Sequence, residues 1–66
     1  MQIQTERGLV SVAAEYKSFT EAINDGYSYS FTAHNCKGHP EYNGCDFYSK
    51  ILENKGCSRR FVVVVG

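Results

Sequence analysis

The strictest pattern in this chain is an alternation of aromatic or apolar side chains with polar ones over residues 27–34. Every second residue from Tyr27 to Ala33 is aromatic or apolar, and the residues between them are serine and threonine, with His34 at the end. Because successive side chains of a strand point to opposite faces, this period of two predicts a β-strand with one aromatic face. We expect that face to form the core; the alternative is a stacking platform for nucleic-acid bases.

A second alternating segment, Leu9–Tyr16, predicts another strand. The side chains that share one of its faces are Val10, Val12, Ala14 and Tyr16. Ile3 either begins this strand or belongs to the first strand of a hairpin, since Glu6–Gly8 suits both a bend and a turn.

One short helix is expected between these two strands. Ser18 and Glu21 have the spacing of a capping box, which predicts that the helix starts there. Asp25-Gly26 ends it, because glycine adopts the left-handed conformation without steric cost. Phe19 and Ile23 lie four residues apart, so we expect both to pack against the aromatic strand.

The C-terminal third predicts a β-hairpin. Residues 46–52 suit either a helix or a strand, and we favour a strand that turns at Glu53–Gly56 and pairs with residues 59–65. The four consecutive valines, 62–65, indicate a strand buried on both faces or one whose edge meets another subunit. Before the hairpin, Asn43-Gly44 suits a tight type I′ turn within an irregular segment, 35–45.

Together these elements predict one small α+β domain, residues 1–66, in the order β-α-β-β-β. Its antiparallel sheet has about four strands, with the short helix packed on one face. A domain of this length buries only about 60% of the surface of its unfolded chain. One short helix cannot cover a whole sheet face, so we expect a homo-oligomer or a protein partner to cover the rest.

Charge and hydropathy favour a cytoplasmic protein. Seven basic and seven acidic residues give a net charge of zero, so no overall field attracts the chain to nucleic acid or to acidic membranes. The longest apolar run, Phe61–Val65, is far too short for a membrane helix, and residues 1–16 lack the pattern of a signal peptide. In a reducing cytosol, three cysteines are expected to be free or metal-bound.

All cysteines and histidines fall between residues 34 and 57, which raises the question of a metal site. The candidate zinc ligands are His34, Cys36, His39 and Cys45, with Cys57 as a possible substitute. Zinc modules commonly carry Cys-x-x-Cys pairs, and this sequence has none. We therefore favour unconnected thiols and no cofactor, with structural zinc and a Cys36–Cys45 disulfide as alternatives.

Catalysis is not expected. Cys36 or Cys45 would be the nucleophile and a histidine its base, but the sequence indicates neither an orienting third group nor an oxyanion hole. We predict that the protein is not an enzyme.

A basic cluster marks the hairpin, where Lys50, Lys55, Arg59 and Arg60 stand against Glu53 alone. Paired arginines can bind a phosphate or a carboxylate, although such a cluster is more commonly a solvated face. The candidate ligand or partner residues are Arg59, Arg60, Tyr27, Tyr29 and His34. A pocket between subunits, lined by Tyr27, Tyr29 and Arg59, is a further possibility.

These features favour a non-enzymatic cytoplasmic binding protein that acts through protein–protein contacts, of the inhibitor or adaptor type. Its size is common among accessory proteins of bacteriophages and mobile elements. The alternative is a zinc-stabilised module that contacts nucleic acid or a phosphate-bearing ligand through Arg59 and Arg60.

Overall fold

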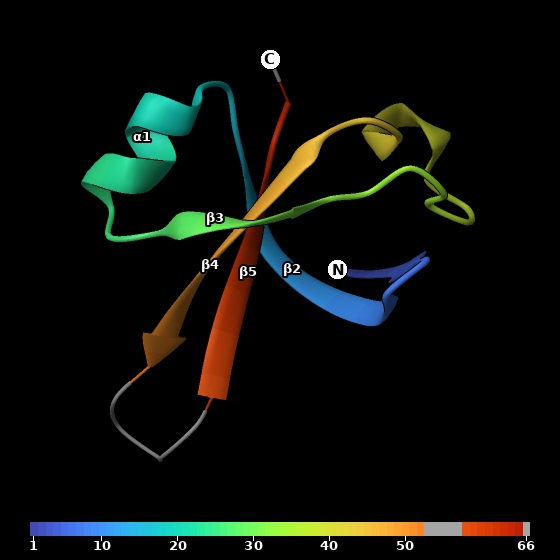
Figure 1. The fold of residues 1–66 in the computed structure, drawn as a ribbon, viewed down its shortest axis with the longest axis horizontal. Helices are drawn as coiled ribbons and strands as arrows, with labels where there is room; N and C mark the ends of the chain where they lie inside the picture. Colours follow the sequence, from blue (N-terminus) through green and yellow to red (C-terminus); the bar gives the residue numbers. More distant parts are fainter. Residues whose placement is uncertain (53–57, 66) are drawn as a thin grey trace.

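The computed structural model describes residues 1–52 and 58–65. Its elements are β1 (Gln2–Thr5), β2 (Gly8–Tyr16), α1 (Phe19–Asn24), β3 (Ser28–Thr32), a 3₁₀ turn (Pro40–Tyr42), β4 (Asp46–Leu52) and β5 (Ser58–Val64). Within the described residues they form one five-stranded sheet, in the order β1-β2-β5-β4-β3, with one short α-helix beside it (Figure 1). The predicted α+β class and the C-terminal strand pair are confirmed.

The predicted antiparallel sheet of about four strands is roughly right, but the described sheet is mixed and has five strands. β4 runs antiparallel to both β3 and β5, but β5 lies parallel to β2. Helix α1 leads the chain back toward the end where β2 began, so β3 runs in the same direction as β2. Two further reversals then bring β5 into that direction as well, and it occupies the gap between β2 and β4.

The additional strand comes from the N-terminus, where the hairpin alternative holds. β1 pairs antiparallel with β2, with Ile3 opposite Val10 and Thr5 opposite Gly8. The outer edge of β1 carries a bridge from Gln4 to Lys37 of the loop, whose N–H donates to the Gln4 carbonyl at 2.9 Å. This edge of the sheet is therefore partly covered.

A β-bulge in β3 divides the predicted aromatic face. Tyr29 lies opposite Tyr48 and Phe31 lies opposite Phe47, so two steps along β3 match one step along β4. Ser30 is the extra residue, and it reverses the side to which the following residues point. Tyr29 therefore meets Tyr48 edge to face at 5.8 Å, while Phe31 stacks on Phe47 at 5.0 Å on the other face. The single aromatic face is a wrong prediction.

β2 shows the same effect where it pairs with β5. Val12 lies opposite Phe61, Glu15 opposite Val63 and Tyr16 opposite Val64, with an irregularity between Val12 and Glu15. The predicted common face of residues 10–16 is therefore split, because Tyr16 points to the opposite side from Val12. Both faces of the sheet obtain apolar side chains as a result.

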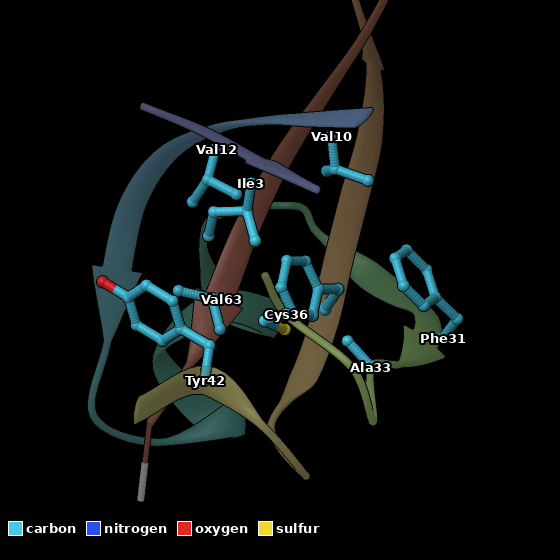
Figure 2. Packing of buried hydrophobic residues seen from close by; sticks show 9 residues of the cluster. Ile3, Val10, Val12, Phe31, Ala33, Cys36, Tyr42 and Val63 are labelled. Carbon is cyan, nitrogen blue, oxygen red and sulfur yellow. The ribbon is translucent and has the colours of Figure 1, made fainter. Parts of the chain in front are cut away.

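Two clusters cover the two faces of the central strands. We call the first the loop-side cluster; it combines β1 and residues 33–45 with the sheet (Figure 2), and its buried members are Ile3, Val10, Val12, Phe31, Ala33, Cys36, Tyr42, Phe47 and Val63. The helix-side cluster lies under α1, and its buried members are Ala22, Tyr27, Tyr48 and Val62. The valine strand is thus buried on both faces, as predicted.

The expected bare sheet face is not found over these central strands. Neighbouring Val62 and Val63 point to opposite faces, and both are 0% exposed. The accessible surface of the protein is 4359 Å², against about 4,200 Å² for an ordinary monomer of this mass. The central strands therefore need no second subunit to cover them, and the homo-oligomer stays a prediction.

Helix α1 starts and ends as predicted but buries a different residue. The Ser18 hydroxyl accepts a hydrogen bond from the Glu21 N–H at 3.3 Å, and Gly26 follows the helix at a φ of 93°. Phe19 and Ile23, expected in the core, are 58% and 52% exposed, because this six-residue helix contacts the sheet through the small Ala22. No described helix is long and apolar enough to cross a membrane.

The turn at Asn43-Gly44 is of type II, so the predicted type I′ turn is wrong. Asn43 has φ −63° and ψ 129°, and only Gly44 has a positive φ, at 80°. The Cys45 N–H donates to the Tyr42 carbonyl at 3.1 Å and closes the turn. Type II requires a left-handed residue at its third position alone, which glycine supplies.

Candidate functional site

The predicted metal ligands do not assemble into one site in the described part of the chain. His34 is exposed, and its backbone N–H donates to the Glu6 carboxylate at 2.9 Å. Nδ1 of His39 lies 3.6 Å from a Glu41 carboxylate oxygen. Among the described residues, no three histidine, cysteine, aspartate or glutamate side chains lie close enough together to hold a metal ion. Cys57, the possible substitute ligand, lies outside those residues.

The two described cysteines have structural surroundings. Cys36 is buried in the loop-side cluster, and its backbone N–H donates to Oδ1 of Asn43 at 2.7 Å. Cys45 is half-buried with its Sγ 3.7 Å from the Glu41 carbonyl oxygen. Both thiols are free, and burial raises the pKa of each. A raised pKa leaves less thiolate at neutral pH, which weakens either side chain as a nucleophile.

Glu6 is a structural anchor that the sequence analysis missed. Its carboxylate accepts from the N–H groups of His34 and, at 3.3 Å, Asn35. Backbone hydrogen bonds, from its own N–H and from His34, hold the pKa of Glu6 below its usual value. The carboxylate therefore ties the β1–β2 turn to the start of the irregular loop through backbone N–H groups.

The most distinctive surface is the free end of the β4–β5 hairpin, which we call the arm: residues 50–52 of β4 and 58–60 of β5. Pairing of β3 with β4 stops at Ser28 and Ser49, and pairing of β2 with β5 starts only at Val12 and Phe61. The arm therefore has two strands and no third, and Figure 1 shows it extending away from the rest of the fold. Two strands alone are marginally stable in water.

Positive charge gathers on the arm. Lys50 lies directly opposite Arg60, and like charges at such positions destabilise a strand pair. Lys50 relieves part of this repulsion, because its Nζ donates to the Asp25 carbonyl at the end of α1, at 3.1 Å. Arg59 and Arg60 are exposed, and no carboxylate of residues 1–52 or 58–65 forms an ion pair with either.

A hollow of about 320 Å³ lies at the base of the arm. Its lining residues are Gly26, Ser28, Tyr29, Ser49, Lys50, Ile51 and Arg59. Tyr29 and Ile51 form an apolar rim, 57% and 60% exposed respectively. Nη1 of Arg59 donates to the buried hydroxyl of Ser49 at 3.1 Å, which holds the guanidinium at the hollow. Two cations, hydroxyl groups and apolar surface thus meet in one place.

The structure brings together only part of the predicted ligand set. Arg59 and Tyr29 line the same hollow, but Arg60 points to the opposite face because neighbouring strand residues alternate. The side chains of Arg59 and Arg60 are therefore not placed to bind the same phosphate group. Tyr27 is buried in the helix-side cluster, 4.6 Å from the Lys50 ammonium, so it contributes no binding surface. His34 lines a separate hollow, which it shares with Tyr29.

Sequence reasoning missed Ser28, Ser49 and Ile51. The two serines carry no signal in the sequence, and their importance comes from the register that places them opposite each other beside Arg59. The exposure of Ile51 follows from the absence of a third strand beside the arm, which no local pattern indicates.

No protein-family model, no curated protein and no solved structure matches this chain. The arm and its hollow carry groups that suit a binding site. A guanidinium, hydroxyl groups and exposed apolar side chains recognise and hold a ligand.

Proposed function

We propose that this protein is a non-enzymatic binding protein that docks an acidic segment of a partner protein on the arm and its hollow. The observation that carries the proposal is the hollow itself, where an arginine that forms no ion pair in the described residues shares the lining with exposed Tyr29 and Ile51. Tyrosine and arginine are enriched in the energetically dominant parts of protein interfaces.

The positive charge of the arm indicates that the partner presents negative charge. The arm carries Lys50, Arg59 and Arg60 on a protein whose total charge is zero, so its attraction is local. A local cationic surface with an apolar rim suits a short acidic segment that also carries apolar side chains. The repulsion between Lys50 and Arg60 would fall when such a segment binds.

Nucleic acid is the second candidate, and one observation favours it. The arm has an arginine on each face, and a two-stranded ribbon fits the major groove of DNA. Neutral net charge opposes it, because nucleic-acid binding draws most of its affinity from many phosphate contacts. The zinc-stabilised form of this alternative has no ligand set among the described residues.

Self-association is proposed separately, through the exposed apolar side chains of α1. Phe19 and Ile23 lie on the outside of the helix, where a second copy of the protein would cover them. Native mass spectrometry of the wild type and of a Phe19→Ser variant measures subunit number directly. Loss of the dimer in the variant supports this surface, and a monomeric wild type refutes it.

A displayed library of random peptides tests the main proposal. Peptides are selected on the wild-type protein and then measured on Arg59→Ala and on Lys17→Ala, an exposed cation at the far end of β2. We expect selected peptides rich in aspartate and glutamate, with binding that falls as salt rises. Binding should be lost in Arg59→Ala and kept in Lys17→Ala. Equal binding to all three proteins contradicts the proposal.

A further inference from the structure

We infer that Arg59, Ser49 and Ser28 form a carboxylate-binding site inside the hollow at the base of the arm. The inference rests on the proposed function, since it names the group by which the partner is held. The carboxylate belongs to an aspartate or glutamate side group or to the terminal carboxylate of a polypeptide, two sources of the same chemistry.

Arg59 supplies the charge and the geometry. A guanidinium has five N–H donors arranged as a planar fork that matches the two oxygens of a carboxylate. In the described residues one of these donors is used, by Nη1 toward Ser49 Oγ at 3.1 Å. That bond holds the guanidinium beside the hollow and leaves the other donors for a ligand.

The two serines add neutral donors next to this fork. Ser28 lies directly opposite Ser49 in the β3–β4 register, and both line the hollow. Ser49 is only 4% exposed and lies opposite Phe61 on the next strand, so its hydroxyl is shielded from water. Because Ser49 accepts from Arg59, its own hydroxyl proton is available to a carboxylate oxygen. Hydrogen bonds to an ion are stronger in such surroundings than in water.

The arrangement of the cations favours a carboxylate over a phosphate. Lys50 also lines the hollow, but its ammonium lies over the Tyr27 ring and donates to the Asp25 carbonyl, so Arg59 supplies the planar fork of the hollow. Arg60 points to the other face. One guanidinium with two hydroxyls balances a single negative charge, and the rim of Tyr29 and Ile51 covers the carbon atoms that carry it.

Chemical-shift titration of the ¹⁵N-labelled protein tests this site with defined probes. Sodium acetate, at constant ionic strength, should shift the amides of Ser28 and Ser49 and the side-chain Nε of Arg59. Inorganic phosphate should bind no more tightly than acetate. Arg59→Ala should weaken acetate binding by about tenfold or more, the usual effect of losing a bond to a charged group. Absence of these shifts in the wild type overturns the inference.

Three variants separate the site from general effects. Arg59→Lys keeps the charge and removes the fork, so it should lose most of the acetate affinity without altering the fold. Ser49→Ala should weaken acetate by about threefold to tenfold, the effect of one lost hydrogen bond. Lys17→Ala should match the wild type. Acetate binding that is unchanged in Arg59→Lys and Ser49→Ala contradicts the assigned geometry.

Two peptides distinguish the sources of the carboxylate. One carries an internal glutamate and an amidated C-terminus, and the other has no acidic residue and a free C-terminus. The peptide that displaces acetate at the lower concentration identifies the source, and displacement by neither overturns the inference. If library peptides bind but acetate does not, the carboxylate site fails while the proposed function stands. If acetate binds and no peptide is selected, the proposed function fails alone.

Discussion

The two ends of β5 have opposite surroundings. At one end, Val62 and Val63 are 0% exposed and lie under two different clusters. At the other end, Ser58, Arg59 and Arg60 are exposed and, among the described residues, pair with no strand other than β4. The same strand thus serves as the core of the sheet and as the arm. The difference follows from where pairing ends, since β2 pairs with β5 only from Val12 and Phe61 onward and β3 starts at Ser28, opposite Ser49.

The largest expected change in unfolding free energy comes from comparing the loss of one large side chain at each end of β4. Phe47→Ala should cost about 3–5 kcal/mol of unfolding free energy, because Phe47 is 0% exposed and stacks on Phe31. Ile51→Ala should change stability by less than about 0.5 kcal/mol, since Ile51 is 60% exposed on the arm.

Urea unfolding followed by tyrosine fluorescence measures both variants. A domain of this size has roughly 3–5 kcal/mol of stability from its core, so Phe47→Ala should be largely unfolded without denaturant. Equal losses in the two variants would mean that the arm is packed as tightly as the core, and the comparison would fail.

A smaller loss of unfolding free energy is expected when the hydrogen bond from Tyr42 to Glu15, within the loop-side cluster, is removed. The phenol hydroxyl donates to the Glu15 carboxylate at 2.8 Å, and this bond raises the pKa of Tyr42 to about 12. Tyr42→Phe should cost about 1 kcal/mol at neutral pH, the value of one such bond.

The pH dependence of the same variant has a definite sign. The folded phenol holds its proton more tightly than the unfolded one, so its stabilisation is present below about pH 10 and is lost as the pH rises through about 12. Melting temperatures of Tyr42→Phe should fall less steeply over this range than those of the wild type. Tyr29→Phe is the control, since the Tyr29 hydroxyl bonds to the neutral Thr32 hydroxyl and not to a carboxylate. An unchanged slope in Tyr42→Phe would show that the bond is absent in solution.

The smallest change in stability is expected for a substitution in the arm. Arg60→Glu replaces the like-charged pair with Lys50 by an opposite pair, which should stabilise the protein by about 0.2–1 kcal/mol. The gain should shrink in high salt, because exposed charges are screened. Arg60→Gln, which removes the charge alone, should show a part of the gain. A loss of stability in Arg60→Glu at low salt would mean that the arm does not pair in this register.

Local signals predicted most of the elements correctly. The capping box at Ser18 and Glu21 depends on neighbours in the sequence, and the helix begins there as expected. The strands that became β2, β3, β4 and β5 carry β-favouring residues between glycines and polar turns. Such signals act within a few residues, so they survive whatever the rest of the fold does.

The faces of the strands were harder to predict than the strands. Tyr29 and Phe31 look like members of one face, yet the bulge at Ser30 separates them. A bulge forms because of the partner strand, and an unbroken period of two gives no sign of it. The exposure of Phe19 has a similar origin, because the depth at which α1 sits depends on the side chains beneath it.

The candidate site shows the same limit. Arg59 and Tyr29 were identified from the sequence, but their meeting with Ser28, Ser49 and Ile51 required the register of three strands. Arg60, next to Arg59 in the sequence, faces the opposite way, and Tyr27 is in the core.

By itself, the sequence determined an α+β fold, its helix start, its strands and a basic C-terminal hairpin, because alternation, capping and turn residues act locally. Tertiary structure alone decided that β5 lies parallel to β2, that two bulges distribute apolar side chains over both faces, and that the arm lacks a third strand. These outcomes depend on contacts between residues far apart in the sequence, which local sequence patterns do not indicate.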